Sequence, residues 1–266
     1  MPIFVGMIFN FISDYLKHRL TSKSRHGTHS PFVYKLTDEV IYDFGAKKEY
    51  KSIENQRKKL FNDDSLITVT DLGAGSQLNK SRTKKVSQIA KNALKNPRLA
   101  QLIYRLAKDN HPKHIIELGT CLGITTSYLS RACPEADIIT VEGCPETAKV
   151  AYRNFRELDL ENVELRVGNF DVLFPEIIAE AERLDFVYID GNHRKQATLD
   201  YFNWCLEKVH EGSLLIFDDI YWSDGMKEAW EEIKNHPRVT VTVDLFWIGL
   251  VYFKKGQAKE HFKIKY

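Results

Sequence analysis

The chain has 266 residues, 43% of them hydrophobic, which is enough to bury a complete α/β core and leave an N-terminal extension. A formal net charge of +2 is too small for a nucleic-acid surface, which needs a concentrated basic face, so no nucleic-acid partner is expected. The four cysteines form neither a C-x-x-C pair nor a disulfide framework, and this favours free thiols in a cytoplasmic protein.

The N-terminal segment up to Leu20 predicts an amphipathic helix. Its apolar side chains fall on one helical face, namely Phe4, Met7, Ile8, Phe11, Ile12, Tyr15 and Leu16. The apolar run is too short to span a bilayer and follows no basic segment, so neither a stable membrane span nor a signal peptide is expected. The apolar face either packs on the protein or on a second subunit, which would make a homodimer, or rests on a membrane surface.

Residues 17–62 predict helices and loops without a strand of the core, and they include the turn-rich sequence HGTHSPF at 26–32. Its two histidines, His26 and His29, either contact a metal or substrate or are ordinary loop residues, because histidine alone is a weak metal signal.

The stretch TVTDLGAGS at 68–76 also has the order strand, acid and glycine turn. A nucleotide-binding fold would then need a helix and a second strand that ends in an acid, but the sequence at 80–110 is polar and predicts helix throughout. The segment 71–75 is therefore interpreted as a surface or lid segment. Residues 1–96 are predicted to form a helical extension, and residues 97–266 the ligand-binding domain.

From His114 onward, apolar runs alternate with helical stretches, which predicts a Rossmann-like, doubly wound α/β sheet. Five runs predict parallel strands, at 114–119, 137–143, 163–168, 184–191 and 213–219. The helices between and after them are expected at 124–131, 145–158, 171–181, 195–209 and 223–235. Two closing runs, at 239–246 and 247–255, are so close in sequence that they must pair antiparallel, which completes a seven-stranded sheet with a C-terminal hairpin.

The sequence IIELGTCLGITTSYL at 115–129 is an apolar strand that ends in an acid, followed by two glycines and a helix start. Gly119 and Gly123 allow a ligand to approach the backbone closely, and Thr120 lies between them. The spacing E-x-G-x-x-x-G differs from the dinucleotide pattern G-x-G-x-x-G. Glu117 would repel a phosphate but suits a cationic ligand such as S-adenosylmethionine.

Ligands of open α/β sheets bind at the carboxyl ends of the strands. Glu142 ends the second strand, where a carboxylate can accept both ribose hydroxyls of an adenosyl ligand; the alternative is an ordinary surface acid. After the third strand, Gly168, Asn169 and Phe170 are candidates for lining an adenine. Asp171 either accepts from the adenine amine or caps the helix that follows.

Asp190, Asp218 and Asp219 end the fourth and fifth strands. Three converging carboxylates repel one another unless they retain protons or hold a cation, and oxygen ligands of this kind suit Mg²⁺. The alternative is that one acid caps a helix and the others are solvated. His193 is either a general base, since imidazole ordinarily titrates near neutrality, or a hydrogen-bond partner of a loop carbonyl.

In combination, these residues resemble the class I S-adenosylmethionine-dependent methyltransferases, specifically small-molecule O-methyltransferases of the catechol, caffeoyl-CoA and antibiotic-sugar types. The resemblance covers residues 99–253. ELGTCLG at 117–123 resembles the first motif of this family, and Glu142 its ribose-binding acid. FDDIYW at 217–222 is similar to the metal-binding segment of the caffeoyl-CoA type, and IDGNH at 189–193 to the fourth-strand ending of the sugar type.

The resemblance implies methyl transfer from S-adenosylmethionine to an oxygen of a small-molecule acceptor, with assistance from Mg²⁺. It places the cofactor at Glu117, Gly119, Thr120, Gly123, Glu142, Gly168, Asn169, Phe170 and Asp190. Asp190, Asp218 and Asp219 would hold the metal, and His193 with Asp190 would be catalytic. The alternatives are methylation of nitrogen or of a macromolecule, or a non-catalytic nucleoside-binding or scaffolding protein of the same fold.

Overall fold

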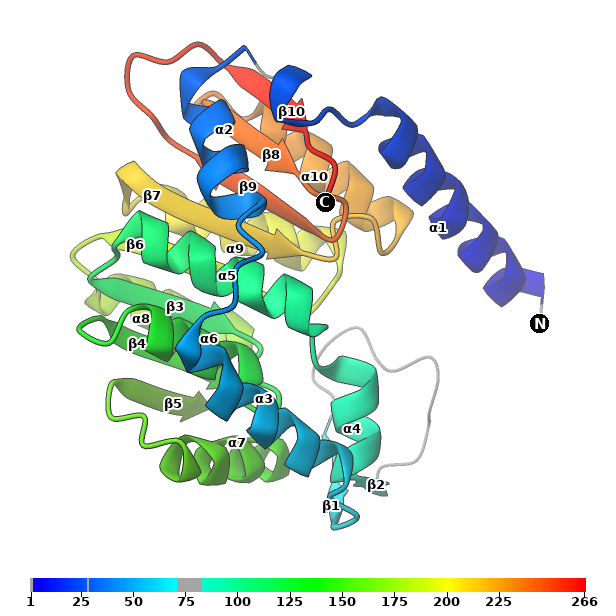
Figure 1. Ribbon diagram of the computed structural model, residues 1–266, viewed down its shortest axis with the longest axis vertical. Helices are drawn as coiled ribbons and strands as arrows, with labels where there is room; N and C mark the ends of the chain where they lie inside the picture. The colour runs from blue at the N-terminus through cyan, green and yellow to red at the C-terminus, as the bar shows by residue number, and fades with distance from the viewer. Residues whose placement is uncertain (1, 28, 71–82) are drawn as a thin grey trace. The chain divides into compact units, whose positions relative to one another are not determined.

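The computed structural model describes residues 2–27, 29–70 and 83–266, and it contains two compact units (Figure 1). The first unit joins Met1–Asp43 to Ala181–Tyr266, and the second is Phe44–Glu180. The predicted domain boundary after residue 96 falls within the second unit and stays a prediction. The predicted lid segment at 71–75 lies outside the described residues.

The second unit has a parallel three-stranded arrangement in the order β3-β4-β5, with α7 packed on β4 and β5 and α8 on β4. Its helices are α3 (Lys48–Phe61), α4 (Val86–Ala93), α5 (Pro97–Asn110), α6 (Ile124–Ala132), α7 (Pro145–Glu157) and α8 (Phe170–Glu180). Its strands are β1 (Leu66–Thr68), β2 (Thr83–Lys85), β3 (His114–Leu118), β4 (Asp137–Glu142) and β5 (Val163–Val167).

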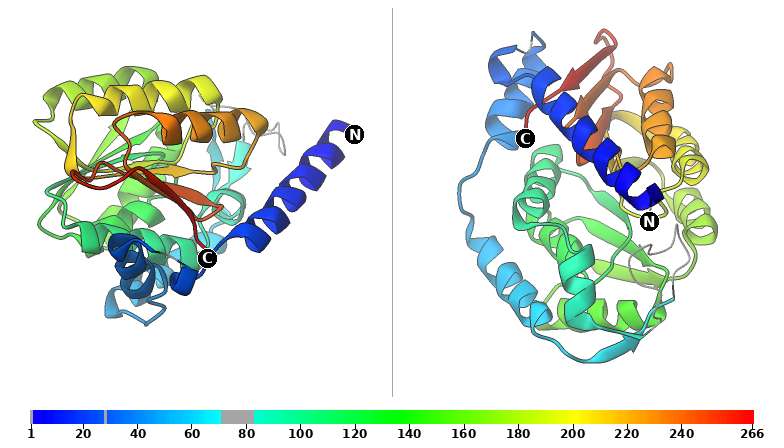
Figure 2. Two further views of the ribbon diagram at one scale, coloured as in Figure 1. Left: turned by 90° about the horizontal axis from the view of Figure 1, so that it is seen from above. Right: turned by 90° about the vertical axis from the view of Figure 1, so that its right-hand side faces the viewer.

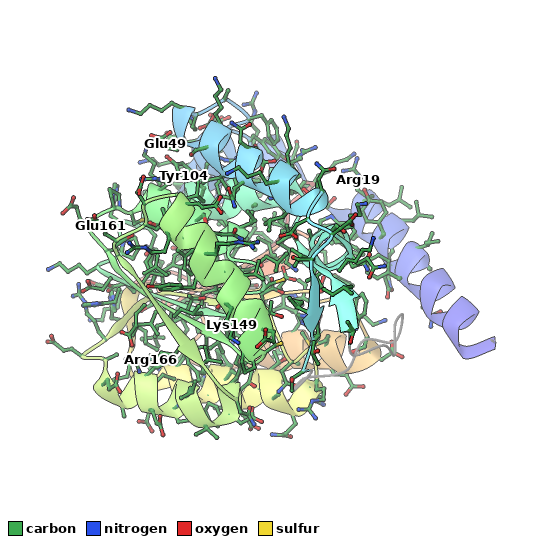
Figure 3. All side chains as sticks on the ribbon, turned by 90° about the horizontal axis from the view of Figure 1, so that it is seen from below. Arg19, Glu49, Tyr104, Lys149, Glu161 and Arg166 are labelled. Atoms are coloured by element: carbon green, nitrogen blue, oxygen red, sulfur yellow. The ribbon has the colours of Figure 1, made fainter. Side chains whose placement is uncertain are left out.

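Charged side chains cover the outer strand of this unit, β5. Arg166 on β5 pairs with Glu164 at 2.6 Å and with Glu180 at 2.9 Å, and Figure 3 shows it among the surface side chains. These ion pairs hold the pKa of Arg166 above its usual range, against a smaller opposing effect of burial. Charges on an outer strand disfavour pairing with another chain.

The first unit contains five strands in the order β10-β8-β9-β7-β6. The strands are β6 (Leu184–Ile189), β7 (Val209–Asp218), β8 (Val241–Asp244), β9 (Ile248–Tyr252) and β10 (Glu260–Lys263). The helical elements are α1 (Pro2–Thr21), η1 (Arg25–Gly27), α2 (Pro31–Lys35), the π-helical turn η2 (Leu36–Ile41), α9 (Lys195–Leu206) and α10 (Asp224–Asn235).

Helices cover both faces of the sheet in the first unit. The Phe202 ring of α9 packs on Phe217 of β7, and the ring of Trp230 on α10 fills the space above Gly249 of β9. Phe217 and Gly249 are register partners and so share this face. Tyr252, three residues beyond Gly249, points to the opposite face and contacts Phe32 of α2. The strands are buried on both faces, which explains their continuous apolar sequences.

The seven strands predicted from His114 onward are all present, with parallel pairing up to β7 and an antiparallel hairpin of β8 and β9. Two strands differ from the prediction. β10, which pairs parallel with β8, was not predicted because its sequence EHFK contains no apolar run. β2 lies in the stretch that was predicted to be helical throughout; that prediction was wrong there, because Thr83–Lys85 pairs antiparallel with Leu66–Thr68.

The amphipathic helix predicted at the N-terminus is α1, whose carboxyl end lies beside β10 while its other end reaches outward (Figures 1 and 2). Phe11 and Tyr15 pack their rings on Phe246, with centroids 5.1 and 5.0 Å away. This part of the apolar face therefore packs on the chain itself. Within the described part of the chain, no helix combines the length and the apolar character that crossing a bilayer requires.

A buried ion pair fixes the carboxyl end of α1. His18 Nε2 lies 3.0 Å from Asp244 Oδ1 at the end of β8, and both side chains are nearly inaccessible. Asp244 also accepts from the Phe246 N–H at 2.9 Å and from the Tyr221 hydroxyl at 2.7 Å. Burial alone raises the pKa of Asp244, but His18 and these two hydrogen bonds outweigh burial and hold the pKa below its ordinary value.

We expect Asp244→Asn to lower the free energy of unfolding at pH 7 by about 3 kcal/mol, because it removes one charge of a buried pair. A depressed carboxyl pKa gives stability that is present above the unfolded pKa, about 4, and is lost as pH falls through the lower folded pKa. The wild type should therefore lose this part of its stability in acid, whereas the variant should not.

Urea unfolding of both proteins across pH 3–7 measures the difference. Asp137→Asn is the matched control, because the side chain of Asp137 is 85% exposed. Equal pH dependence in wild type and Asp244→Asn would show that the buried pair contributes nothing to the acid response.

Candidate functional site

Glu117, at the end of β3, is completely buried and linked to the neighbouring elements. Its Oε2 accepts hydrogen bonds from the hydroxyls of Thr126 on α6 and Thr140 on β4, the latter at 2.7 Å. Thr140 is also 2.6 Å from the hydroxyl of Thr120. The carboxyl group of Glu117 thus joins β3, β4 and α6 beneath the glycine turn.

The turn after β3 needs its glycines for conformation and for space. Gly119 and Gly123 have φ of 105° and 78°, which side chains rarely tolerate. A Cβ on Gly123 would also lie 2.5 Å from the ring of Phe155 on α7. The N–H groups of Gly119 and Thr120 donate to the carbonyl of Val141, so the turn folds back on β4.

Glu142, at the end of β4, holds two turns with its two carboxylate oxygens. Oε2 accepts from the Cys121 N–H at 2.8 Å, and Oε1 accepts from the Cys144 N–H at 2.9 Å. The residue is half-buried. Each carboxylate oxygen can accept more than one hydrogen bond, so these contacts are compatible with a further hydroxyl partner.

The turn after β5 differs from the sequence-based interpretation in one detail. The cap of α8 is Asn169, whose Oδ1 accepts from the N–H of Asp171 at 3.0 Å, so Asp171 itself is not the capping side chain. Asp171 instead lies in the first turn of α8, where a negative charge is favourable. Gly168 donates its N–H to the carbonyl of Glu142, and Phe170 is half-buried at the helix start.

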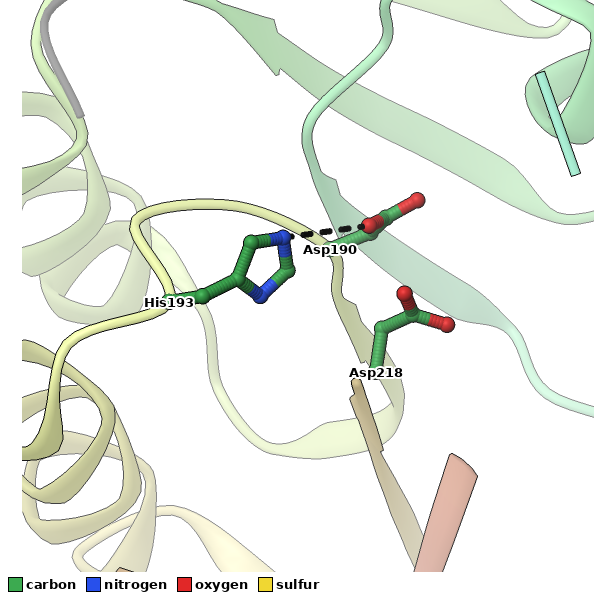
Figure 4. Close-up of side chains that lie close together, drawn as sticks. All are labelled: Asp190, His193 and Asp218. Carbon is green, nitrogen blue, oxygen red and sulfur yellow. Dashed lines mark ion pairs between the residues drawn. The ribbon is translucent and has the colours of Figure 1, made fainter. Parts of the chain in front are cut away.

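The acids that end β6 and β7 form a compact cluster in the first unit (Figure 4). Asp190, His193 and Asp218 each present one ligand atom, and these three atoms lie within 4.8 Å of one another. His193 Nε2 is 3.8 Å from Asp190 Oδ1. Asp218 is almost fully buried, whereas the side chains of Asp190 and His193 are 16% and 22% exposed. The cluster is therefore accessible from one side.

Tyr188, two residues before Asp190 on β6, connects the two carboxylates. Its hydroxyl is 3.1 Å from Asp190 Oδ2 and 3.2 Å from Asp218 Oδ1, and the side chain is fully buried. One hydroxyl hydrogen can be donated to only one of two carboxylates at a time. Sequence analysis missed this residue, because Tyr188 occupies an ordinary strand position. Side chains two residues apart on a strand share a face, and this was the signal that could have placed Tyr188 on the side of Asp190.

Asp219 lies beside this cluster rather than within its compact core. It adopts a left-handed φ of 52°, and its N–H donates to the carbonyl of Trp247 at 2.8 Å. Its Oδ2 lies 3.8 Å from His193 Nε2, the same nitrogen that is 3.8 Å from Asp190 Oδ1, so two carboxylates lie near one ring nitrogen. Asn192 is not part of this acidic cluster; its side-chain amide contacts Tyr201 and Arg194 instead.

Residues 116–220 match the family described as a methyltransferase domain. A catechol O-methyltransferase of Niastella koreensis is 31% identical over 147 residues, which are 54% of this chain and 64% of that relative. Residues 116–220 thus carry the sequence features of a methyltransferase domain. The chain thus spans just under two thirds of that curated relative.

Two solved structures share the fold of this chain. The O-methyltransferase TomG of Streptomyces achromogenes, crystallised with S-adenosylmethionine, is 17% identical with a TM-score of 0.56, covering 84% of this chain and 95% of its own. An O-methyltransferase of Bacillus cereus, crystallised with S-adenosylhomocysteine, is 18% identical with a TM-score of 0.55, covering 82% and 94%. At these identities the likeness concerns the fold alone.

We expect Gly123→Ala to destabilise the methyltransferase domain by about 2–4 kcal/mol, because a left-handed alanine costs about 1–2 kcal/mol and overpacking against Phe155 adds to it. Thermal and urea unfolding measure the loss. Gly168→Ala is the matched control, because its Cβ would meet only the movable end of Leu173. Comparable losses in the two variants would mean that the Phe155 contact does not decide the preference for glycine.

Proposed function

We propose that this protein transfers a methyl group from S-adenosylmethionine to a hydroxyl oxygen of a small-molecule acceptor, with a divalent cation, Mg²⁺, at the acidic cluster. The observation that carries the proposal is the acidic cluster at the ends of β6 and β7, within a segment that matches a methyltransferase domain. The names of the relatives and the cofactors crystallised with the structural neighbours support the same reaction class.

An acceptor screen tests the reaction as a whole. The protein, S-adenosylmethionine and Mg²⁺ are incubated with phenols, catechols and aliphatic alcohols, and mass spectrometry detects the gain of one methyl group. Methylation only of amines would favour the nitrogen-directed alternative. Cofactor binding without any turnover would favour the non-catalytic nucleoside-binding alternative.

The second unit is proposed to bind the cofactor at the turns after β3, β4 and β5. Glu142 would accept the ribose hydroxyls while its backbone contacts to Cys121 and Cys144 hold the carboxylate in place. The turn of Gly119, Thr120 and Gly123 would approach the methionine part, with the buried charge of Glu117 behind it favouring a cation. Gly168, Asn169 and Phe170 would line the adenine.

We expect Glu142→Gln to weaken binding of S-adenosylhomocysteine at least about tenfold, because an amide replaces a charged acceptor of hydroxyl and backbone N–H groups. Isothermal titration calorimetry measures the affinity. Glu146→Gln on α7 is the control, because Glu146 pairs with Lys149 at the surface. Unchanged affinity in Glu142→Gln would remove this residue from the cofactor site.

The acidic cluster has the composition of a divalent-cation site. Asp190 and Asp218 supply carboxylate oxygens close together, and the Tyr188 hydroxyl can neutralise only part of their mutual repulsion. Asp190 and Asp218 would therefore hold the cation, with Asp219 and His193 at its side. A bound divalent cation lowers the pKa of a coordinated hydroxyl and orients its oxygen.

His193 is proposed to take the proton of the acceptor hydroxyl. Its Nε2 lies 3.8 Å from carboxylate oxygens of both Asp190 and Asp219, which would stabilise the imidazolium after proton transfer. The acceptor oxygen then forms a bond to the methyl carbon while the carbon–sulfur bond breaks and its electron pair stays on sulfur. The products are the methyl ether and S-adenosylhomocysteine. Asp190, between His193 and Tyr188, would keep the imidazole oriented toward the acceptor.

We expect Asp218→Asn to weaken Mn²⁺ binding at least about tenfold, because it removes one of two charged ligands. Tyr188→Phe should give a smaller loss, since it removes one hydrogen-bond donor beside the two carboxylates but no charged ligand. Electron paramagnetic resonance of free Mn²⁺ measures binding directly, and competition by Mg²⁺ tests whether the two ions share the site.

Both variants should retain their affinity for S-adenosylhomocysteine. Asp224→Asn, with an exposed side chain on α10, is the control. Wild-type Mn²⁺ affinity in Asp218→Asn would exclude the cluster as the metal site without touching the proposed cofactor site.

A further inference from the structure

A cavity lies in the first unit, at the edge of the sheet formed by β8 and β10. Its volume is about 480 Å³, within the range typical of small-molecule sites. The wall is built from the end of α1, the turn that follows it, the last turn of α10, β8 and β10. None of Asp190, His193, Asp218 or Asp219 lines it, so it is distinct from the proposed metal site.

The lining of this cavity is rich in cationic and hydrogen-bonding side chains from separate elements. It contains Thr21, Lys23, Gly27, His29, Lys234, Thr242, Asp244, Glu260, His261, Phe262 and Lys263. Three ammonium groups thus come from three different places in the chain. Backbone hydrogen bonds bring two of these lysines close together. Lys23 donates its N–H to the carbonyl of Lys263 at 2.8 Å, and its own carbonyl accepts from the N–H of Lys265 at 3.0 Å.

The acidic residues do not cancel this positive charge. Both carboxylate oxygens of Asp244 are already engaged, by His18 and Phe246 on one side and by Tyr221 on the other. Lys234 has Glu231 as its partner at 2.6 Å. Lys23 and Lys263 take part in no ion pair among the described residues. Their two positive charges therefore exceed the single negative charge that Glu260 contributes to the lining.

His261 adds a neutral hydrogen-bonding group. Burial, together with the positive charges of Lys234 and Lys259, lowers its pKa, so the imidazole is mainly neutral at pH 7. Its Nδ1 lies 2.8 Å from the hydroxyl of the buried Thr242. In the tautomer in which Nδ1 accepts from Thr242, the other ring nitrogen carries a hydrogen and can donate to a ligand.

We propose that this cavity binds a phosphate-bearing small molecule, with Lys23 and Lys263 as the charged contacts and His29 and His261 as hydrogen-bond partners. Lysine acts on a phosphate as a point charge, and several lysines can approach a tetrahedral anion from different directions. A planar carboxylate is better matched by the paired donors of arginine, and the lining has none. In this proposal His29 of the HGTHSPF turn contacts a ligand and is not an ordinary loop residue.

Isothermal titration calorimetry with inorganic phosphate, at constant ionic strength, tests the site in the full-length protein. The wild type should show saturable binding. The double variant Lys23→Gln/Lys263→Gln should bind at least about tenfold more weakly, because it loses two charge-assisted contacts. Glycerol 3-phosphate compared with inorganic phosphate then distinguishes a phosphomonoester ligand from free phosphate, since only the ester would gain affinity from its organic part; glycerol alone should not bind.

Lys255→Gln is the matched control, because Lys255 is 83% exposed and lies outside the lining. It should leave phosphate binding unchanged, and both variants should keep the wild-type unfolding midpoint and the affinity for S-adenosylhomocysteine. Absence of saturable phosphate binding, or equal binding by wild type and the double variant, would overturn the proposal. Neither result would affect the proposed methyl transfer, whose residues lie elsewhere.

Discussion

A carboxylate that leaves water must find hydrogen bonds or a counter-charge, because burying it alone costs several kcal/mol. Glu117, Asp218 and Asp244 are all nearly inaccessible, and each stands at or beside a strand end. Oε2 of Glu117 accepts from threonine hydroxyls, Asp244 is contacted by an imidazole, a phenol and a backbone N–H, and Asp218 lies beside the Tyr188 hydroxyl. These hydrogen bonds and ion pairs also position the turns that follow the strands. The contacts that compensate the buried acids therefore shape the candidate sites as well.

The sequence was sufficient to predict the strand and helix pattern from His114 onward. Parallel strands covered on both faces are apolar along their whole length, and the glycines and acids that follow them mark their ends. The same reasoning placed Asp190 and Asp218 at one edge, and the structure brings them together within their own unit. Periodicity was a weak guide where a strand is short and polar, as in β2 and β10, because pairing partners distant in sequence stabilise these segments.

The residues that sequence reasoning missed act through contacts rather than through motifs. Tyr188 is an unremarkable strand tyrosine until the fold places its hydroxyl between two carboxylates. Asn169 was predicted only as a residue that lines the adenine, but it also caps α8 in place of Asp171, because the helix begins one residue earlier than predicted. Asp244 was not predicted to have a role, because an apolar run follows it in the sequence. Its contacts nevertheless fix α1 to β8. Each depends on geometry that spacing along the chain does not encode.

Asp244 also shows why α1 and the two candidate sites of the first unit depend on the same packing. Its carboxylate binds His18 of α1, accepts from Tyr221, and lines the cavity at β8 and β10. Tyr221 follows Asp219 by only two residues and stacks on Phe246 at 4.7 Å, the same ring that receives Phe11 and Tyr15 of α1. Displacing α1 would therefore expose a buried charge and unpack the aromatic rings beside the acidic loop. The attachment of the N-terminal helix to the first unit thus combines these rings, the His18–Asp244 pair and the pair of Asp14 with Lys227 at 2.7 Å.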